Sequence, residues 1–182
     1  KDIIPHQPGV LLQGFQVFDN YLVINEKENA QSRIKIINQT TQKSHFITLK
    51  EEFYNIGIGY NPDFATDSLQ FSYSSFEMPT TTFRYNMETK KKRLVKQHSK
   101  PIEHPFYTYV VERKWVTAKD GKLIPLTLIS HKWRAKRKSF NDNGKVYLTS
   151  YGSYGSGQGL AGGPKAHHLV NSGYVYAIAH IR

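Results

Sequence analysis

Serine-based acyl transfer needs a nucleophilic serine on a sharp strand–turn–helix, a histidine that takes its proton and a carboxylate that orients the histidine. Its usual sequence sign is Gly-x-Ser-x-Gly, followed by an Asp and then a His. No serine in the C-terminal half has glycine both two residues before it and two residues after it, although Ser153 and Ser156 lie among glycines. No Asp or Glu follows Asp142. The chain therefore contains no complete catalytic triad that the sequence can identify.

The segment Gly157-Gln-Gly159-Leu-Ala-Gly162 matches the glycine pattern of dinucleotide-binding loops. That chemistry needs a strand running directly into the loop, a helix opening on it and an acid about 20 residues later. Here six residues separate Ser150 from Gly157, Pro164 interrupts the expected helix, and no acid follows. We therefore interpret the match as coincidental, and we predict no organic cofactor.

The histidines near the C-terminus, His167, His168 and His180, are candidate metal ligands. Adjacent histidines point in divergent directions on a helix or a strand, and no carboxylate is near them in the sequence. Surface and packing roles are the better interpretation, so we predict no metal site. The string Asn38-Gln-Thr40 fits a glycosylation acceptor, but we interpret it as an ordinary turn.

The run His131–Lys138 is strongly basic and contains Trp133, a pairing that can bind phosphate and stack on a base. The whole chain has 25 Lys and Arg against 14 Asp and Glu, a net charge of +11. One hypothesis is therefore a stand-alone basic β-rich module that binds nucleic acid or anionic surfaces. The other is that solvated charge on part of a larger protein accounts for the excess.

The chain has no cysteine, which excludes disulfides, thiolate metal sites and a thiol nucleophile. The sequence contains no apolar run long enough to cross a bilayer and no leader at its start. The first residue is Lys1, so the natural start is expected elsewhere. The simplest expected location is the cytoplasm, with no membrane partner.

The elements that would position these residues are mainly β-strands, and the N-terminal half of the sequence contains a repeat. Asp19-Asn-Tyr-Leu-Val-Ile aligns with Asp67-Ser-Leu-Gln-Phe-Ser at an offset of 48 residues, and at the same offset Asn38 meets Asn86 and Lys43 meets Lys91. Strands are predicted by alternation and composition at Tyr21–Ile24, Arg33–Ile37, His45–Leu49, Tyr54–Tyr60, Ser68–Tyr73, Thr81–Tyr85 and Arg93–Val95. Four short strands per unit suit a β-propeller blade, and a small β-sandwich or meander is the alternative.

The pattern changes after Lys96, where two prolines in His98–Pro105 indicate a linker. Asp120-Gly121 lies between two apolar runs and predicts a hairpin that joins strands at Val110–Thr117 and Leu123–Ser130. A strand at Val146–Thr149, a short helix at Ala166–Asn171 and a buried strand at Tyr174–Ile181 are expected in that order.

Three segments of this second half resemble one family. Glu112-Arg-Lys-Trp-Val-Thr-Ala-Lys-Asp-Gly121, followed by Ile124-Pro125, resembles the entry into the peptidase domain of oligopeptidase B, in the prolyl oligopeptidase family. Tyr151-Gly-Ser-Tyr-Gly155 resembles a glycine–tyrosine turn of that family. Gly173-Tyr-Val-Tyr-Ala-Ile-Ala-His-Ile-Arg182 resembles the strand that runs into a glycine-rich segment.

The N-terminal part also resembles the last propeller blades of that family, notably at Leu11–Gln16, Gly59-Tyr-Asn-Pro62 and Tyr73–Thr81. The resemblance implies a β-rich part followed by an α/β part. Residues 1–97 would be the last two blades of a seven-bladed propeller, 98–109 a hinge, and 110–182 the first strands of an incomplete α/β-hydrolase peptidase domain.

The resemblance further implies a serine-type endopeptidase that cleaves short peptides after Arg or Lys, without metal or cofactor. Tyr151 matches the tyrosine whose hydroxyl donates to the oxyanion, and Tyr154 matches an aromatic residue of the substrate-binding wall. The sequence departs from the family at Thr149-Ser150, where Tyr-Gly is usual. Because the triad would lie beyond Arg182, the chain alone is expected to be inactive and to have no nucleic-acid partner.

Overall fold

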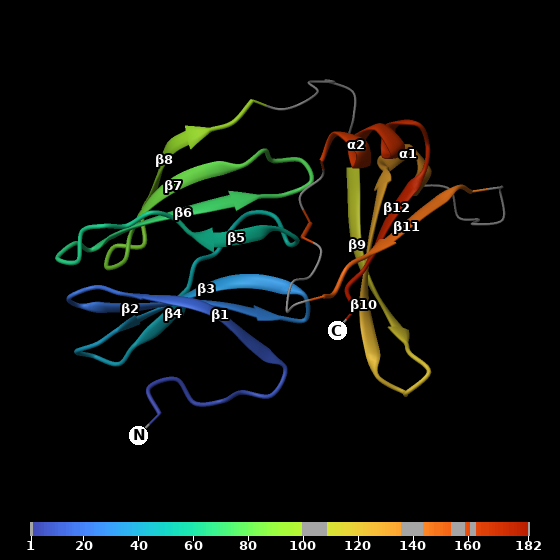
Figure 1. The fold of residues 1–182 in the computed structure, drawn as a ribbon. Helices are drawn as coiled ribbons and strands as arrows, with labels where there is room; N and C mark the ends of the chain where they lie inside the picture. Colours follow the sequence, from blue (N-terminus) through green and yellow to red (C-terminus); the bar gives the residue numbers. More distant parts are fainter. Residues whose placement is uncertain (1, 100–108, 136–143, 154–158, 161–162, 182) are drawn as a thin grey trace. The chain divides into compact units, whose positions relative to one another are not determined.

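A computed structural model describes residues 2–99, 109–135, 144–153, 159–160 and 163–181 (Figure 1). The chain divides into two compact units, Lys1–Ser99 and Lys100–Arg182, called unit 1 and unit 2 below. Each unit is described by itself. Most of the predicted linker, residues 98–109, lies outside the described residues.

Unit 1 consists of two four-stranded antiparallel sheets in which neighbours in sequence are neighbours in the sheet. They lie as two layers, blue and green in Figure 1. Alternating apolar and polar residues produce these strands, because successive side chains point to opposite faces. The first sheet contains β1 (Val10–Val17), β2 (Tyr21–Glu28), β3 (Gln31–Asn38) and β4 (Ser44–Phe46). The second contains β5 (Asn55–Ile58), β6 (Ser68–Ser74), β7 (Thr81–Asn86) and β8 (Lys92–Gln97).

The core of unit 1 draws side chains from both sheets. On β6, Leu69, Phe71 and Tyr73 are buried and alternate with half-buried neighbours, as the sequence pattern predicts. Val23 of β2 and Ile34 of β3 join them in one apolar cluster. Burial of each such side chain stabilises the fold by about 1.5–3 kcal/mol, so this shared core holds the two sheets together.

The repeat is confirmed at the turns that join β3 to β4 and β7 to β8. The Asn38 N–H donates to Lys43 O and the Asn86 N–H to Lys91 O, both at 2.9 Å. The side-chain oxygen of Asn38 accepts from the Thr41 N–H at 2.8 Å, and that of Asn86 from the Thr89 N–H at 2.7 Å. The same asparagine thus closes the same turn in both halves of the repeat.

One strand of unit 1 was not predicted, and two were predicted too long, including Tyr54–Tyr60, of which only Asn55–Ile58 is the strand β5. The strand β1 contains an irregular register between Leu12 and Gly14, so its apolar residues do not alternate cleanly. The predicted strand His45–Leu49 is only the three residues of β4. Ile47 lies beyond the end of β4 but still contacts β3. Its N–H donates to Ile34 O at 3.0 Å, and its side chain is buried in the core.

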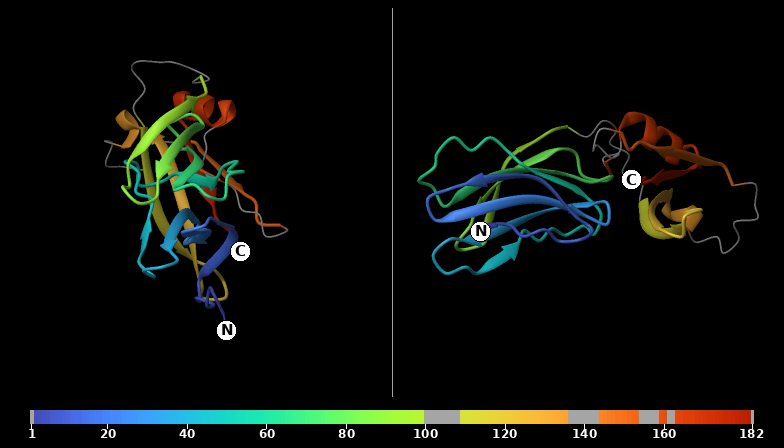
Figure 2. Two further views of the ribbon diagram at one scale, coloured as in Figure 1. Left: turned by 90° about the vertical axis from the view of Figure 1, so that its left-hand side faces the viewer. Right: turned by 60° about the horizontal axis from the view of Figure 1, so that its bottom comes forward.

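Unit 2 contains a mixed sheet in the order β11-β12-β10-β9. The hairpin β9 (Tyr109–Thr117) and β10 (Leu123–His131) turns at Gly121, whose φ of +79° favours glycine. Strand β12 (Val175–Ala179) pairs antiparallel with β10 and parallel with β11 (Val146–Ser150). The hairpin is long and strongly twisted in Figure 2.

Among the described residues of unit 2, two segments are helical, α1 (Lys132–Ala135) and α2 (Pro164–Asn171). The prediction that Pro164 would interrupt a helix is wrong, because α2 begins at this residue. It lies in the first turn of α2, where a proline costs nothing because the missing N–H would have no partner within the helix. The basic run, for which no element was predicted, begins at the last residue of β10 and continues into the helical turn α1. The strand β12 is buried on both faces, as predicted.

Candidate functional site

The candidate site follows from the parallel pairing of β11 and β12. Ser150, the last residue of β11, lies opposite Ala179, the last residue of β12. Tyr151 and His180 therefore follow two adjacent parallel strands at the same carboxyl edge. In open α/β sheets this edge is where ligands bind. Tyr151 is 49% exposed, so its phenol is accessible to a reacting group.

His180 has a structural position at this edge. Its N–H donates to Pro125 O at 3.0 Å, and its Nε2 lies 2.8 Å from the Thr127 hydroxyl. Both His180 and Thr127 are buried. These contacts fasten the end of β12 to β10, in agreement with the packing role predicted for this histidine.

His167 and His168 lie on α2 and do not meet His180 as ligands of one ion. The His167 ring is 5.8 Å from the Tyr109 ring, whose hydroxyl donates to Asn171 Oδ1 at 2.9 Å. The Tyr109 ring also packs against His131, with the two ring centroids 6.1 Å apart. Within the part of the chain that the structure describes, no three potential ligands are grouped for a metal.

Three sequence candidates lie partly or wholly beyond the described residues. Tyr154, the predicted wall aromatic, is outside them, as are the residues 136–143 and most of the Gly157–Gly162 pattern. Trp133 is described and is 46% exposed on α1, 5.9 Å from the His131 ring. It is partly exposed and also packs on His131, the last residue of β10.

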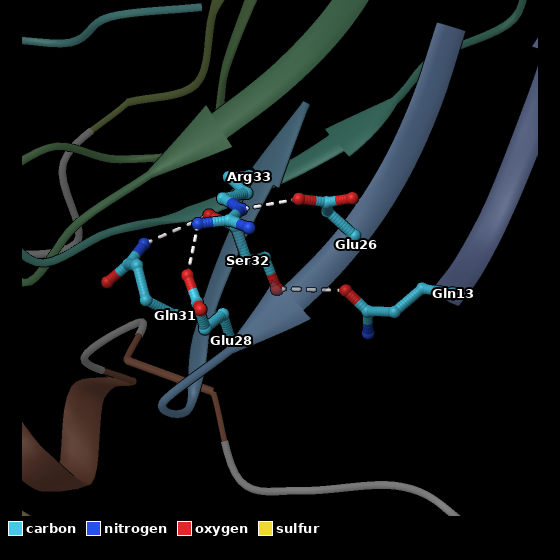
Figure 3. A network of polar contacts seen from close by, with 6 residues as sticks. All are labelled: Gln13, Glu26, Glu28, Gln31, Ser32 and Arg33. Atoms are coloured by element: carbon cyan, nitrogen blue, oxygen red, sulfur yellow. Dashed lines mark hydrogen bonds and ion pairs between the residues drawn. The ribbon is translucent and has the colours of Figure 1, made fainter. Parts of the chain in front are cut away.

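A polar network at the β2–β3 hairpin was missed by the sequence analysis (Figure 3). The Arg33 guanidinium donates to Glu26 at 2.6 Å and also to Glu28. It lies 4.6 Å above the ring of Phe46. Glu26 and Arg33 are directly opposite in the hairpin register, a cross-strand pairing that the sequence could have indicated. Both carboxylates accept hydrogen bonds from one guanidinium, so the network fixes the hairpin.

The same hairpin is tied to the second sheet of unit 1. The Gln31 side-chain amide donates to Tyr54 O at 2.7 Å, just before β5 begins. Burial raises the pKa of Tyr54, and the positive charge of Arg33 opposes that rise. Helices of the described segments are all too short or too polar to traverse a lipid bilayer.

Comparison with known proteins agrees with this arrangement. Residues 1–98 match the N-terminal β-propeller domain of prolyl oligopeptidase. Dipeptidyl aminopeptidase BI of Pseudoxanthomonas mexicana is 35% identical over 185 aligned residues, covering 100% of this chain and 24% of that protein. A prolyl endopeptidase-like protein of Xenopus laevis is 26% identical and matches 69% of this chain and 17% of its own length.

Solved structures of the family share the fold. Oligopeptidase B from Trypanosoma brucei, with covalently bound antipain, superposes with a TM-score of 0.84 at 22% identity, over 98% of this chain and 26% of that one. Oligopeptidase B from Leishmania major gives 0.82, also at 22% identity, over 99% of this chain and 26% of that one. The chain thus spans about a quarter of the length of these relatives. The prediction of a β-propeller domain is confirmed, and because the propeller match covers more than half of the chain, the protein belongs to the prolyl oligopeptidase family of peptidases.

Proposed function

We propose that this chain is part of a serine-type oligopeptidase that cleaves short peptides after Arg or Lys. Residues 1–97 are the last two blades of its seven-bladed propeller, 98–109 the hinge, and 110–182 the first strands of its α/β-hydrolase domain. The whole enzyme needs no metal or organic cofactor, acts in the cytoplasm, and has short basic peptides rather than nucleic acid or membrane as partners. The chain alone lacks the nucleophile, base and acid, and is inactive.

The observation that carries this proposal is the match of residues 1–98 to the family propeller domain. Two four-stranded meanders in sequence, with the repeated asparagine turn, are the arrangement expected of two adjacent blades. The match favours this interpretation over the small sandwich and over the stand-alone basic module, since it accounts for the whole of unit 1.

Unit 2 supports the hydrolase part of the proposal. Its antiparallel hairpin followed by a parallel strand pair is a mixed sheet that can continue with further parallel strands. Tyr151 follows the carboxyl end of β11, at the edge where an α/β enzyme collects its reactive groups. A fixed phenol donor aimed at a developing oxyanion contributes about 3–4 kcal/mol to transition-state stabilisation in comparable sites. This is the role that we propose for Tyr151.

A second candidate specificity comes from the bacterial relative at 35% identity, which is named a dipeptidyl aminopeptidase. An enzyme of that type releases dipeptides and requires a free amino terminus on its substrate. An endopeptidase that cuts after Arg or Lys also accepts substrates whose amino end is blocked. The amino-terminal requirement therefore separates the two candidates.

The test uses both this chain and the longer protein that contains it. We expect benzyloxycarbonyl-Arg-Arg-aminomethylcoumarin to be cleaved by the longer protein and not by residues 1–182. Turnover by the 182-residue chain that a serine-directed inhibitor blocks would contradict the absence of a triad. Cleavage by the longer protein of Gly-Arg-aminomethylcoumarin, but not of its amino-blocked form, would replace the proposed specificity with the dipeptidyl one.

A further inference from the structure

Unit 1 contains a pocket between the two equivalent asparagine turns. Its volume is about 420 Å³, and one wall comes from the β3–β4 turn and the start of β4, the other from residues just after β7. Tyr21 and Met87 line it and are only 5% and 1% exposed, so they are the most buried residues of its lining. These two residues, called the floor of the pocket below, offer apolar surface to an apolar group.

The rim of the pocket is cationic. Lys43 and Lys90 both line it, and neither ammonium group makes an ion pair with any residue that the structure describes. The lining contains a single carboxylate, that of Glu88. Two ammonium groups above an apolar floor form a site for a negatively charged head group on an apolar body.

His45 also lines the pocket, and the positive charge of Lys90 acts on its pKa. Its Nε2 lies 3.0 Å from the Tyr85 hydroxyl, which joins β4 of one sheet to β7 of the other. Burial lowers the pKa of His45, and the nearby Lys90 ammonium lowers it further. The imidazole is thereby kept neutral at pH 7, while Lys43 and Lys90 supply the fixed positive charge.

The repeat explains why the two turns have the same shape, but it does not explain why a lysine stands at position 90. Lys43 aligns with Lys91 at the offset of 48 residues, whereas Lys90 aligns with Gln42. Gln42 and Lys90 have the same left-handed backbone, with φ of +59° and +60°. The turn therefore accepts an uncharged side chain at this position, and the lysine that lines the pocket is not a requirement of the fold.

We propose that this pocket binds a small carboxylate, with its apolar body on Tyr21 and Met87 and its charge between Lys43 and Lys90. The ligand is either a free carboxylic acid or the C-terminal carboxylate of a short peptide, which share the same chemistry. The inference goes beyond the proposed peptidase activity and does not depend on it, since every residue involved lies in unit 1.

The first experiment measures binding to the 182-residue chain by titration in ¹H–¹⁵N spectra. The probes are N-acetyl-phenylalanine and N-acetyl-phenylalaninamide, which differ only in the negative charge. We expect saturable shifts at Ser44 and Met87, with at least about tenfold tighter binding of the acid. Equal binding of acid and amide, or no saturation by the acid, would overturn the proposal.

A second arm distinguishes the sources of the carboxylate. Gly-Gly-Gly-Phe with a free C-terminus is compared with the same peptide amidated and with N-acetyl-phenylalanine. Tighter binding of the free-acid peptide than of N-acetyl-phenylalanine assigns the pocket to peptide C-termini; the reverse order assigns it to free acids. Either order supports the shared chemistry, and preference for both amides contradicts it.

The variants test the two lysines against a matched loss of charge. The double variant K43Q/K90Q should weaken binding of N-acetyl-phenylalanine by at least about tenfold, and E88Q should strengthen it. The control K50Q/K96Q removes two exposed lysines that do not line the pocket and should change the affinity less than about twofold. If K50Q/K96Q loses as much affinity as K43Q/K90Q while both chains keep native spectra, the binding is general charge attraction and the proposal is wrong.

Discussion

The two units are both mainly β, but they are held together differently. Unit 1 joins each strand to the next by a short connection and buries large side chains such as Phe18 and Phe71 between two sheets. Unit 2 joins β10 to β11 and β11 to β12 by long connections, and its buried core uses smaller residues such as Val170 and Ala177. The two-sheet core of large side chains should make unit 1 the more stable unit.

The outer strand β11 sharpens this contrast. Val146 is 54% exposed and Leu148 is 64% exposed, although both belong to a strand. In unit 1 every residue of the middle strands β2 and β6 is instead buried or half-buried. A parallel pair normally lies in a sheet covered on both faces. The exposure of these β11 side chains therefore indicates that unit 2 is less completely packed than unit 1.

The largest expected effect is that of Phe71→Ala in unit 1. Phe71 is fully buried and stacks on Phe83 with ring centroids 5.7 Å apart, so its removal leaves a cavity. The expected loss of unfolding free energy is about 3–5 kcal/mol. Urea unfolding followed by far-UV circular dichroism measures it, with the exposed Phe15→Ala as the control.

Tryptophan emission makes that variant a test of the comparison as well. Both tryptophans, Trp115 and Trp133, belong to unit 2. If the two units unfold separately, Phe71→Ala shifts the circular-dichroism transition of unit 1 and leaves the emission transition in place. A parallel shift of both signals would show one cooperative unit and break the contrast.

A smaller effect is expected from Val170→Ala in unit 2. Val170 lies on α2 and is fully buried, and the change removes two methyl groups. We expect a loss of about 2 kcal/mol, seen in the tryptophan emission during urea unfolding. The exposed His168→Ala on the same helix is the control. No change in Val170→Ala would mean that the core of unit 2 is already loose.

The repeated turn predicts matched effects within unit 1. Asn38→Ala and Asn86→Ala each remove a side-chain oxygen that accepts from the turn backbone. Asn86→Ala should lower the free energy of unfolding by about 1 kcal/mol, the usual net value of one such hydrogen bond. Asn38→Ala should lower it by at least as much, because the Asn38 oxygen accepts from both the Thr40 and the Thr41 N–H. Thr40→Ala, where only the backbone N–H contributes to the turn, is the control. A smaller loss at Asn38 than at Asn86 would contradict the equivalence of the turns.

The smallest effect is a pH dependence that comes from His45. Its folded-state pKa lies below the unfolded value because of burial and the Lys90 charge. The unfolded chain therefore takes up the proton first, and the contribution of His45 to stability is present above about pH 6.5 and is lost as the pH falls below it. Urea midpoints at pH 7.5, 6.5 and 5.5 should show a smaller decline in His45→Gln than in wild type, while the exposed His6→Gln follows wild type.

Much of the fold could be predicted from local pattern. Alternating residues gave the positions of β2, β3, β6 and β7, and Asp120-Gly121 gave the turn of the β9–β10 hairpin. These features depend on neighbouring residues, whose preferences act before any distant contact forms. The irregular strand β1 and the helical start at Pro164 were not predicted, because a register shift and a first-turn proline both interrupt the simple pattern.

The candidate sites divide in the same way. The repeat, the family likeness and the choice of Tyr151 as a candidate all came from residue types in order along the chain. The fold was needed to find that β11 runs parallel to β12 and that Lys43 and Lys90 line one pocket. The physical reason is that these relations join residues far apart in the chain, and their free energy arises only when the strands between them have already paired.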